Sequence, residues 1–333
     1  MKLATPSVSV DSSPQAIALA IENCRHGVLT VTGFPRPPFD EILSTFDQLS
    51  NDKAFTDRLN EAYPKNLVYK DAFANGKGGD NIDKKRVLDL SPDRLEEMKK
   101  RDLELVESVE NEGSLALTMA FWERLRSEFA PKIIEAVAQA IGSPDVLADS
   151  AFNYRMVDYY ERSATSTPPR CGEHRDFGSF TLVFPSHSGL QILAGNEWKD
   201  IQVPNLGDAV LLFGWCTQIR SNGRIPAALH RVTHKQQVAA NQKGMIPRRA
   251  SAVLFCAPKQ PTTPLEPVVR PGEEPKYIGG IQAGQLRGAM ALKWQMREGT
   301  IRPEDLIKEE AEILATNMRT QDDVVQKTVA AST

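Results

Sequence analysis

The sequence predicts an α+β fold whose core is a double-stranded β-helix, or jelly roll. In the first third of the chain, apolar residues recur at the three-to-four-residue spacing of an amphipathic helix. After Gly142-Ser143-Pro144 the pattern changes to short β-branched and aromatic runs separated by turn residues. That spacing is typical of a sandwich or barrel of short strands and differs from an alternating strand–helix array. We therefore expect a helical region that supports a jelly roll over residues 150–260.

The helices of the first third are predicted from caps and spacing. Ser13-Pro14 supplies a side-chain cap and a proline at the first helical position, so a helix is expected to begin there. Helical spacing returns at 38–49 and at 92–110. The longest helical pattern runs over 114–141, and we expect Pro131 to kink it.

The strands are predicted from β-branched and aromatic runs that end at turn residues. One lies at 28–32 in the first third, and those of the core are expected at 154–160, 180–184, 190–193, 209–213, 228–232 and 250–256.

The remaining segments complete the predicted organisation. The Gly- and Asn-containing segment 72–84 is typical of a loop, and a polar helix is expected at 302–316, followed by a loosely held tail. We interpret 1–333 as a single catalytic domain, made of a mainly helical support region (1–145), the jelly-roll core (150–260) and a C-terminal segment (261–333).

Composition excludes several classes of partner. A formal net charge of −3 offers no electrostatic attraction to nucleic acid or to an anionic membrane. No apolar run approaches the roughly 18 residues of a membrane span, and the first residues lack the apolar segment of a secretion signal. The four cysteines are scattered, which argues against a disulfide scaffold and a zinc knuckle. We expect a cytoplasmic protein that acts on a small molecule and has no obligate protein partner.

A non-haem iron site is indicated by His174, Asp176 and His230. Residues two apart on a strand face the same side, so the first two side chains can chelate one metal. Two imidazoles and one carboxylate hold one face of an octahedral iron and leave the other face open. A His–Asp turn without metal is the alternative reading of the first pair, and His234 is the alternative third ligand. His230 is preferred because it lies within the apolar run Ala-Ala-Leu-His-Arg-Val.

A binding site for a carboxylate is indicated by Arg249 and Ser251, which share one face of the last predicted strand with Phe255. A buried arginine is costly unless its charge is paired. Its planar fork, with a hydroxyl beside it, matches the carboxylate of a small co-substrate. A carboxylate of the protein is the alternative partner.

Several aromatic residues are candidates for the cavity wall. Tyr159 and Tyr160 point to opposite faces of one strand, so at most one of them serves the cavity, and alternation alone makes each a packing residue. Phe213, Trp215 and Phe255 are pocket candidates, which favours a small, fairly flat organic substrate.

These motifs, in this order, resemble the Fe(II)/2-oxoglutarate-dependent dioxygenases of the isopenicillin N synthase-like group. The resemblance covers most of the chain, through AIALAIENCRHGVLTVTGFP, MVDYY, EHRDFGSFTLVF, GLQIL, EWKDIQVP, SNGRIPAALHRV and RRASAVLFCAP. The chain departs from the family where Asp158 replaces Asn, where Gly214-Trp215 replaces Gly-Asp, and in the long insert at 235–248.

The resemblance implies roles for individual residues. It implies that His174, Asp176 and His230 are the catalytic iron ligands, that Arg249 and Ser251 hold the distal carboxylate of 2-oxoglutarate, that Tyr160 hydrogen-bonds this co-substrate, and that Phe255 and Phe213 face the substrate.

The implied activity is oxidation of a small organic molecule with Fe(II), 2-oxoglutarate and O2. The chain is most similar to fungal natural-product enzymes, which favours a polyketide-derived phenol or cyclohexadienone as substrate. Hydroxylation, desaturation and a rearrangement such as ring expansion to a tropolone all remain open. The alternatives are an iron oxidase of the same fold that uses no 2-oxoglutarate and a non-catalytic ligand-binding jelly roll.

Overall fold

A computed structural model gives the fold of most of the chain. It describes residues 2–71, 85–144, 149–163, 170–203, 205–233, 244–277 and 279–297. The loop expected at 72–84, most of the 235–248 insert, the helix expected at 302–316 and the tail lie outside these ranges. His234, the alternative third ligand, lies outside them too.

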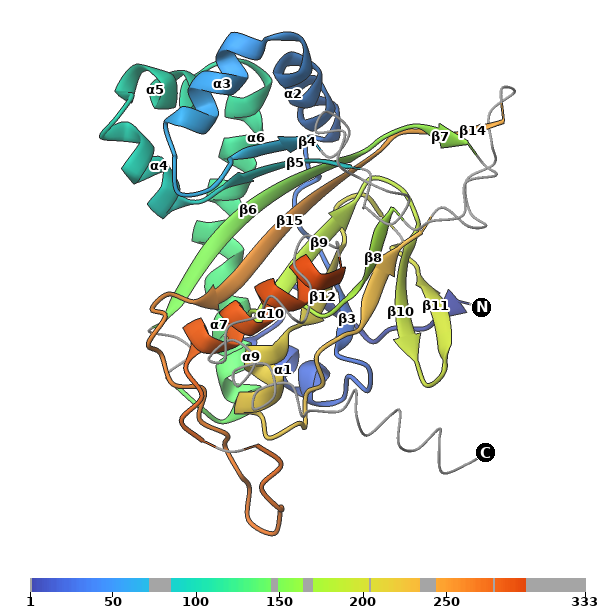
Figure 1. The fold of residues 1–333 in the computed structure, drawn as a ribbon. Coiled ribbons are helices and arrows are strands. Elements are labelled where there is room, and N and C mark those ends of the chain that lie inside the picture. Colours follow the sequence, from blue (N-terminus) through green and yellow to red (C-terminus); the bar gives the residue numbers. More distant parts are fainter. Residues whose placement is uncertain are drawn as a thin grey trace.

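The strands of the described chain form two facing sheets and one short pair. In chain order they are β1 (Lys2–Leu3), β2 (Ser7–Ser9), β3 (Val28–Thr32), β4 (Tyr69–Asp71), β5 (Lys85–Leu90), β6 (Ser150–Tyr159), β7 (Arg162–Ser163), β8 (Cys171–His174), β9 (Phe180–Pro185), β10 (Leu190–Ala194), β11 (Glu197–Ile201), β12 (Ala209–Phe213), β13 (His230–Val232), β14 (Met245–Ile246) and β15 (Arg249–Pro258). The larger sheet has the order β2-β3-β12-β9-β15-β6-β5-β4, the smaller has β1-β11-β10-β13-β8, and β14 pairs with β7 (Figure 1).

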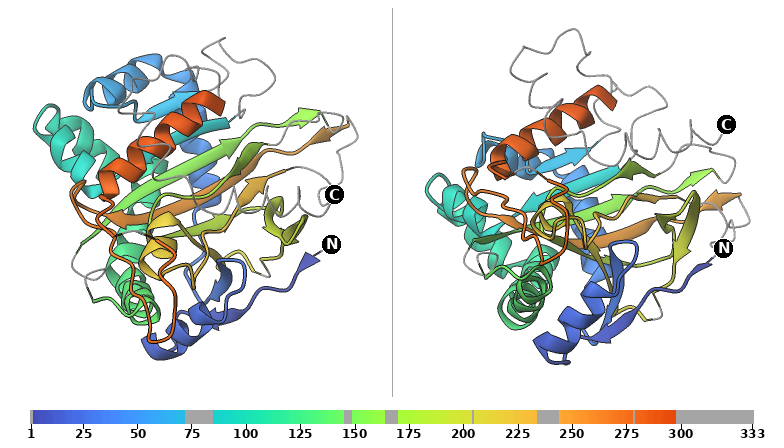
Figure 2. Two further views of the ribbon diagram at one scale, coloured as in Figure 1. Left: turned by 60° about the horizontal axis from the view of Figure 1, so that its bottom comes forward. Right: turned by 90° about the horizontal axis from the view of Figure 1, so that it is seen from below.

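The helices lie mainly on one side of the larger sheet. They are α1 (Pro14–Glu22), α2 (Phe39–Asn51), α3 (Lys53–Glu61), α4 (Pro92–Lys99), α5 (Leu103–Asn111), α6 (Gly113–Arg124), the π-helical turn η1 (Leu125–Phe129), α7 (Ala130–Ile141), α9 (Trp215–Arg220) and α10 (Ala283–Arg297). Figures 1 and 2 show the helices of the first third grouped on one side, with the smaller sheet on the other. The large apolar core joins helices α1 to α7 to the larger sheet, and α9 and α10 pack in a separate cluster.

A second apolar cluster lies between the two sheets. On β15 the side chain of Val253 belongs to this inner cluster, while Ala252 and Leu254 belong to the core beneath the helices. Because side chains alternate along a strand, Arg249 and Ser251 share the inner side with Val253. The space between the sheets therefore receives the polar residues that the sequence singles out.

The α+β fold with a jelly-roll core is confirmed. All the core strands predicted from the sequence are present, and the strand predicted at 209–213 has the bounds of β12. The first third contributes more strand than expected, because β1 to β5 extend both sheets. These strands are short, apart from β3 and β5, and a run of two or three residues carries little periodicity.

The helical predictions are confirmed with two interruptions. The side chain of Ser13 accepts a hydrogen bond from the Ala16 amide at 3.3 Å and caps α1. The pattern at 92–110 is two helices, because Asp102 caps the second by accepting from the Leu105 amide at 3.0 Å. The pattern at 114–141 passes through η1, and Pro131 stands in the first turn of α7. Helices α3, α9 and α10 were not predicted. Of the helices described, none is long and apolar enough to cross a membrane.

Candidate active site

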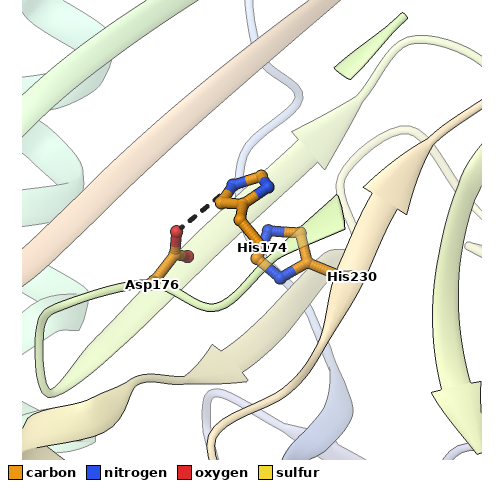
Figure 3. A group of neighbouring side chains, drawn as sticks. All are labelled: His174, Asp176 and His230. Atoms are coloured by element: carbon orange, nitrogen blue, oxygen red, sulfur yellow. Dashed lines mark ion pairs between the residues drawn. The ribbon is translucent and has the colours of Figure 1, made fainter. Parts of the chain in front are cut away.

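His174 and His230 meet across the smaller sheet. They lie opposite each other in the antiparallel pairing of β8 with β13, and their ring centroids are 4.2 Å apart. Asp176 lies two residues beyond β8, where the chain has left the strand, and its Oδ1 is 3.7 Å from Nε2 of His174 (Figure 3). One ligand atom from each of the three residues lies within 4.8 Å of the others. This is the arrangement that a two-histidine, one-carboxylate metal site requires.

Backbone carbonyls set the orientation of both imidazole rings. Nδ1 of His174 lies 2.8 Å from the carbonyl oxygen of Gly172, and Nδ1 of His230 lies 3.0 Å from that of Ala228. A carbonyl oxygen only accepts, so each Nδ1 carries the hydrogen and donates it. The unprotonated nitrogen of each neutral ring is then Nε2, which is the nitrogen that coordinates a metal.

Burial and charge favour the protonation states that bind a metal. Burial lowers the pKa of His174 to about 3, and the neighbouring His230 acts in the same direction. Burial alone would raise the pKa of Asp176, but the adjacent His230 and His174 and a hydrogen bond from Thr181 lower it. His174 is therefore neutral and Asp176 ionised at neutral pH, as metal ligation demands.

Thr181 is a supporting residue that the sequence analysis missed. Its Oγ1 donates a 2.6 Å hydrogen bond to Oδ2 of Asp176, which leaves Oδ1 on the side of His174. Thr181 lies on β9, inside an apolar run, and a threonine in such a run looks like an ordinary strand residue.

Gly214-Trp215, where the chain departs from the family pattern, holds the loop that carries Asp176. The Trp215 amide donates to the Asp176 carbonyl at 2.9 Å. A Cβ on Gly214 would lie 2.3 Å from the Gly178 carbonyl oxygen and 2.7 Å from that of Asp176, so only glycine fits there. The Trp215 ring packs in a separate cluster and lies 5.6 Å from Cζ of Arg175, so its role is structural.

Arg249 and Ser251 are both buried, with 2% exposure each, on the inner side of the larger sheet. Nε of Arg249 donates to the His187 carbonyl at 3.0 Å. Among the described residues, Nη1 and Nη2 of Arg249 and Oγ of Ser251 have no hydrogen-bond partner. Such groups are costly to bury unless a ligand completes them. The donor set fits one carboxylate, bound by the arginine fork and the hydroxyl.

Tyr159, and not Tyr160, stands beside Arg249, which corrects the role implied for Tyr160. The ring of Tyr159 lies 5.0 Å from Cζ of Arg249, and the two residues are register partners on β6 and β15. Tyr160 comes just after β6; its hydroxyl donates to Asp71 at 2.5 Å, and its ring lies 5.0 Å from Cζ of Arg86. As expected, only one of the two tyrosines lies at the site. The family resemblance implied Tyr160, whereas the structure places Tyr159 beside Arg249.

The contacts of Asp158 on the opposite face of β6 explain why the side chain of Tyr160 lies away from Arg249. Asp158 is fully buried there and accepts hydrogen bonds from Nε of Arg86 at 2.7 Å and from Nε of Arg248 at 2.8 Å. Arg248 also donates to Asp47 on α2, so these contacts anchor this face of β6 to α2. Asp158 occupies the place of the family asparagine, on the side away from the candidate iron ligands.

The two phenylalanine predictions have different outcomes. Phe255 packs against the cluster between the sheets and is partly exposed, so it remains a candidate for substrate contact. Phe213 is completely buried in the core beneath the helices. Val210 and Leu212 are the inward residues of β12, and alternation places Phe213 on the other side, so Phe213 is a packing residue.

Comparison with known proteins finds a family match over the part of the chain that holds this site. The model of the 2OG-Fe(II) oxygenase superfamily matches residues 150–258, which hold every candidate residue above. The 2-oxoglutarate-Fe(II) type oxidoreductase ppzD of Metarhizium rileyi is 29% identical over 171 residues, 47% of this chain and 47% of that protein. The matched part thus spans about half the length of the curated relatives.

Solved structures share the fold over nearly the whole chain. The rice dioxygenase for auxin oxidation gives a TM-score of 0.64 at 19% identity, and the match covers 89% of this chain and 96% of that one. A full-length Neurospora crassa protein, solved in complex with alpha-KG and 5-formyluracil, gives a TM-score of 0.60 at 18% identity over 85% and 94% of the two chains.

The fold and the site define a jelly roll with a facial His-Asp-His centre. Residues 150–258, which carry this centre, match the model of the 2OG-Fe(II) oxygenase superfamily.

Proposed function

We propose that the protein is a non-haem dioxygenase that uses Fe(II) and 2-oxoglutarate to oxidise a small organic substrate. The observation that carries the proposal is that Nη1 and Nη2 of the buried Arg249 and the hydroxyl of Ser251 have no hydrogen-bond partner among the described residues. They lie between the same two sheets as the His-Asp-His triad. The distal carboxylate of 2-oxoglutarate would bind to Arg249 and Ser251, and its keto acid would chelate a metal held by the triad.

The residues of this chain would each have a distinct role. His174 and His230 bind the metal through Nε2, and Asp176 binds it through Oδ1 while Thr181 holds the other oxygen. Arg249 binds the distal carboxylate, and its charge is complementary to that group in a buried setting.

When bound at this site, Fe(II) and 2-oxoglutarate would supply the oxidising power: 2-oxoglutarate and O2 would give succinate and CO2, and the second oxygen atom would enter the substrate at the cleaved C–H bond or leave as water. The protein contributes position and excludes competing reactions. The apolar cluster around the site keeps bulk water away from the reacting groups.

The proposed substrate is a fairly flat molecule of secondary metabolism, such as a polyketide-derived phenol, and the outcome is hydroxylation, desaturation or ring rearrangement. Phe255 on the cavity side supports an aromatic or conjugated body. The N. crassa structure of the same fold was solved with 5-formyluracil, which also has a flat ring. Four buried, unlinked thiols support a cytoplasmic location.

Succinate release tests the function directly. The protein is incubated with Fe(II), ascorbate, O2 and 2-oxoglutarate, and succinate formation and O2 uptake are measured. We expect succinate above the level given by His174→Ala. O2 uptake without succinate would indicate an oxidase that uses no 2-oxoglutarate. The absence of both O2 uptake and succinate would indicate a binding protein.

A further inference from the structure

An arginine that the proposed chemistry does not use lies on the same inner face of the larger sheet as Arg249. Arg155 lies on β6, two residues before Val157 and four before Tyr159, both of which belong to the cluster between the sheets. Strand alternation puts Arg155 on that side as well. Its Cζ lies 5.1 Å from the ring centroid of Phe255.

The strand register connects Arg155 to the metal site. Phe255 pairs with Thr181 on β9, and the hydroxyl of Thr181 donates to the iron-ligand candidate Asp176. Arg249 lies at the other end of β15, six residues from Phe255, which is about 20 Å along a strand. The carboxylate subsite and Arg155 thus lie toward opposite ends of the inner face of β15.

Asp89 fixes the guanidinium of Arg155 in one orientation. Nε donates to Oδ1 of Asp89 at 2.7 Å and Nη2 donates to Oδ2 at 2.8 Å. Asn153 also donates to Oδ1, at 3.3 Å. This side-on bidentate contact uses one edge of the planar group and holds it rigidly.

The rest of the guanidinium is available to a ligand. In the described part of the chain, Nη1 of Arg155 has no hydrogen bond. The side chain is 36% exposed, whereas that of Asp89 is 3% exposed. Because the buried carboxylate balances the charge of Arg155, the pair offers a directed hydrogen-bond donor and little net attraction for anions in general.

We propose that Arg155 determines substrate specificity by donating a hydrogen bond from Nη1 to an oxygen of a planar, conjugated substrate whose ring packs beside Phe255. The substrate class is an aromatic or conjugated molecule that bears a carbonyl, carboxylate or enolate oxygen. Asp89 is the positioning residue of this donor. The inference rests on the proposed function, because it assigns the substrate side of that same site.

Two fluorinated probes of equal shape test the donor. 4-Fluoroacetophenone carries a carbonyl oxygen, and 4-fluoro-α-methylstyrene carries a CH2 group in its place. Binding to the anaerobic Fe(II)–2-oxoglutarate protein is measured by 19F NMR line broadening, with 4-fluorobenzoate as a charged acceptor. We expect both oxygen-bearing probes to bind about tenfold more tightly than the styrene, as one hydrogen bond to a charged donor predicts.

Matched variants assign the preference to Arg155. The double variant Asp89→Asn/Arg155→Met removes both charges together and should bind the three probes equally. Arg155→Lys keeps the charge but loses the planar fork, so its preference should fall at least threefold; it also decides the case if the double variant does not fold. The control is Arg231→Met, because Arg231 lies against Trp198, 4.1 Å from its ring centroid, on the smaller sheet.

Each outcome separates this inference from the proposed function. Equal binding of the probes to wild type, or an unchanged preference in both Arg155 variants, would overturn the role of Arg155. The charge-transfer band of the Fe(II)–2-oxoglutarate chelate, recorded on the same samples, reports on the proposed function alone. Absence of that band in wild type would overturn the proposed function first.

Discussion

His230 lies directly across an antiparallel strand pair from His174, and their ring centroids are 4.2 Å apart. This pairing brings together two residues that are 56 positions apart in sequence (230 − 174). Rigid strands carry both rings, and each ring donates to a carbonyl two residues earlier in its own chain segment. The metal site is therefore largely preformed by backbone pairing, which keeps the cost of ordering its ligands low.

Asp176→Asn should abolish Fe(II) binding while it preserves the shape of the site. The amide removes the only carboxylate of the triad and places a poorer ligand next to the two histidines. Iron content after anaerobic loading and desalting measures the effect. Full occupancy in Asp176→Asn would show that the carboxylate is no ligand.

Thr181→Val should weaken Fe(II) binding by about tenfold to a hundredfold without abolishing it, because partners that orient a ligand typically contribute that much. The valine keeps the β-branched shape and removes the 2.6 Å hydrogen bond to Asp176. An Fe(II) titration with a competing chelator gives the affinity. A wild-type affinity would mean that the loop holds Asp176 without help from Thr181.

Arg249→Ala should raise the dissociation constant of 2-oxoglutarate by about a hundredfold, since two charge-assisted hydrogen bonds are lost. Iron affinity should stay unchanged, and Ser251→Ala should have a smaller effect of the same kind. The dissociation constant is obtained by titrating the iron-loaded protein with 2-oxoglutarate under anaerobic conditions. If the arginine were purely structural, stability would fall and the affinity for 2-oxoglutarate would not.

Tyr159→Leu and Tyr160→Leu should affect different properties, the first 2-oxoglutarate affinity and the second stability. The first removes the ring beside Arg249 and should weaken 2-oxoglutarate binding about fivefold, in line with a partly buried cation–aromatic contact. The second removes the hydrogen bond to Asp71 and should lower the free energy of unfolding by about 1 kcal/mol with no change in 2-oxoglutarate affinity. Titration with 2-oxoglutarate and denaturant unfolding of both variants measure the two effects. Weaker 2-oxoglutarate binding in Tyr160→Leu but not in Tyr159→Leu would contradict these roles.

The metal-free protein should lose stability as the pH falls from about 6.5 toward 3. The pKa of His174 is lowered to about 3 in the fold, mainly by burial, and returns to about 6.5 in the unfolded chain. The unfolded chain therefore binds more protons in this window, so the free energy of unfolding rises with pH across it. The lowered pKa of Asp176 acts in the same direction.

His174→Gln should flatten this pH dependence, because glutamine does not titrate. Urea unfolding of metal-free wild type and variant at several pH values between 3 and 7 measures the difference. Equal slopes for the two proteins would contradict the lowered pKa of His174.

The iron ligands and the carboxylate fork were accessible from sequence because they depend on residue type and short spacing. Histidine, aspartate and arginine are rarely placed inward between apolar strand residues without a function, and alternation then groups Arg249 with Ser251. Both groups lie where the motifs predicted, although Asp176 sits just beyond the strand and not on it.

The tertiary partners were not accessible, because alternation does not say which face of a strand looks inward. The buried ionic contacts of Asp158 with Arg86 and Arg248 decide this for β6, and they involve residues 72 and 90 positions away. The same limit led to the wrong choice of Tyr160 and Phe213. Gly214 is required by a close approach of two loops that no local pattern reveals.

The central claim is that one site holds both Fe(II) and 2-oxoglutarate, and an anaerobic titration tests it most directly. Metal-free protein receives Fe(II) and then 2-oxoglutarate, and the weak visible charge-transfer band of the chelate is recorded. We predict a band in wild type that is lost at matched 2-oxoglutarate concentration in Arg249→Ala. A protein that takes up Fe(II) but gives no band would contradict the 2-oxoglutarate site, and one that takes up no Fe(II) would contradict the metal site itself.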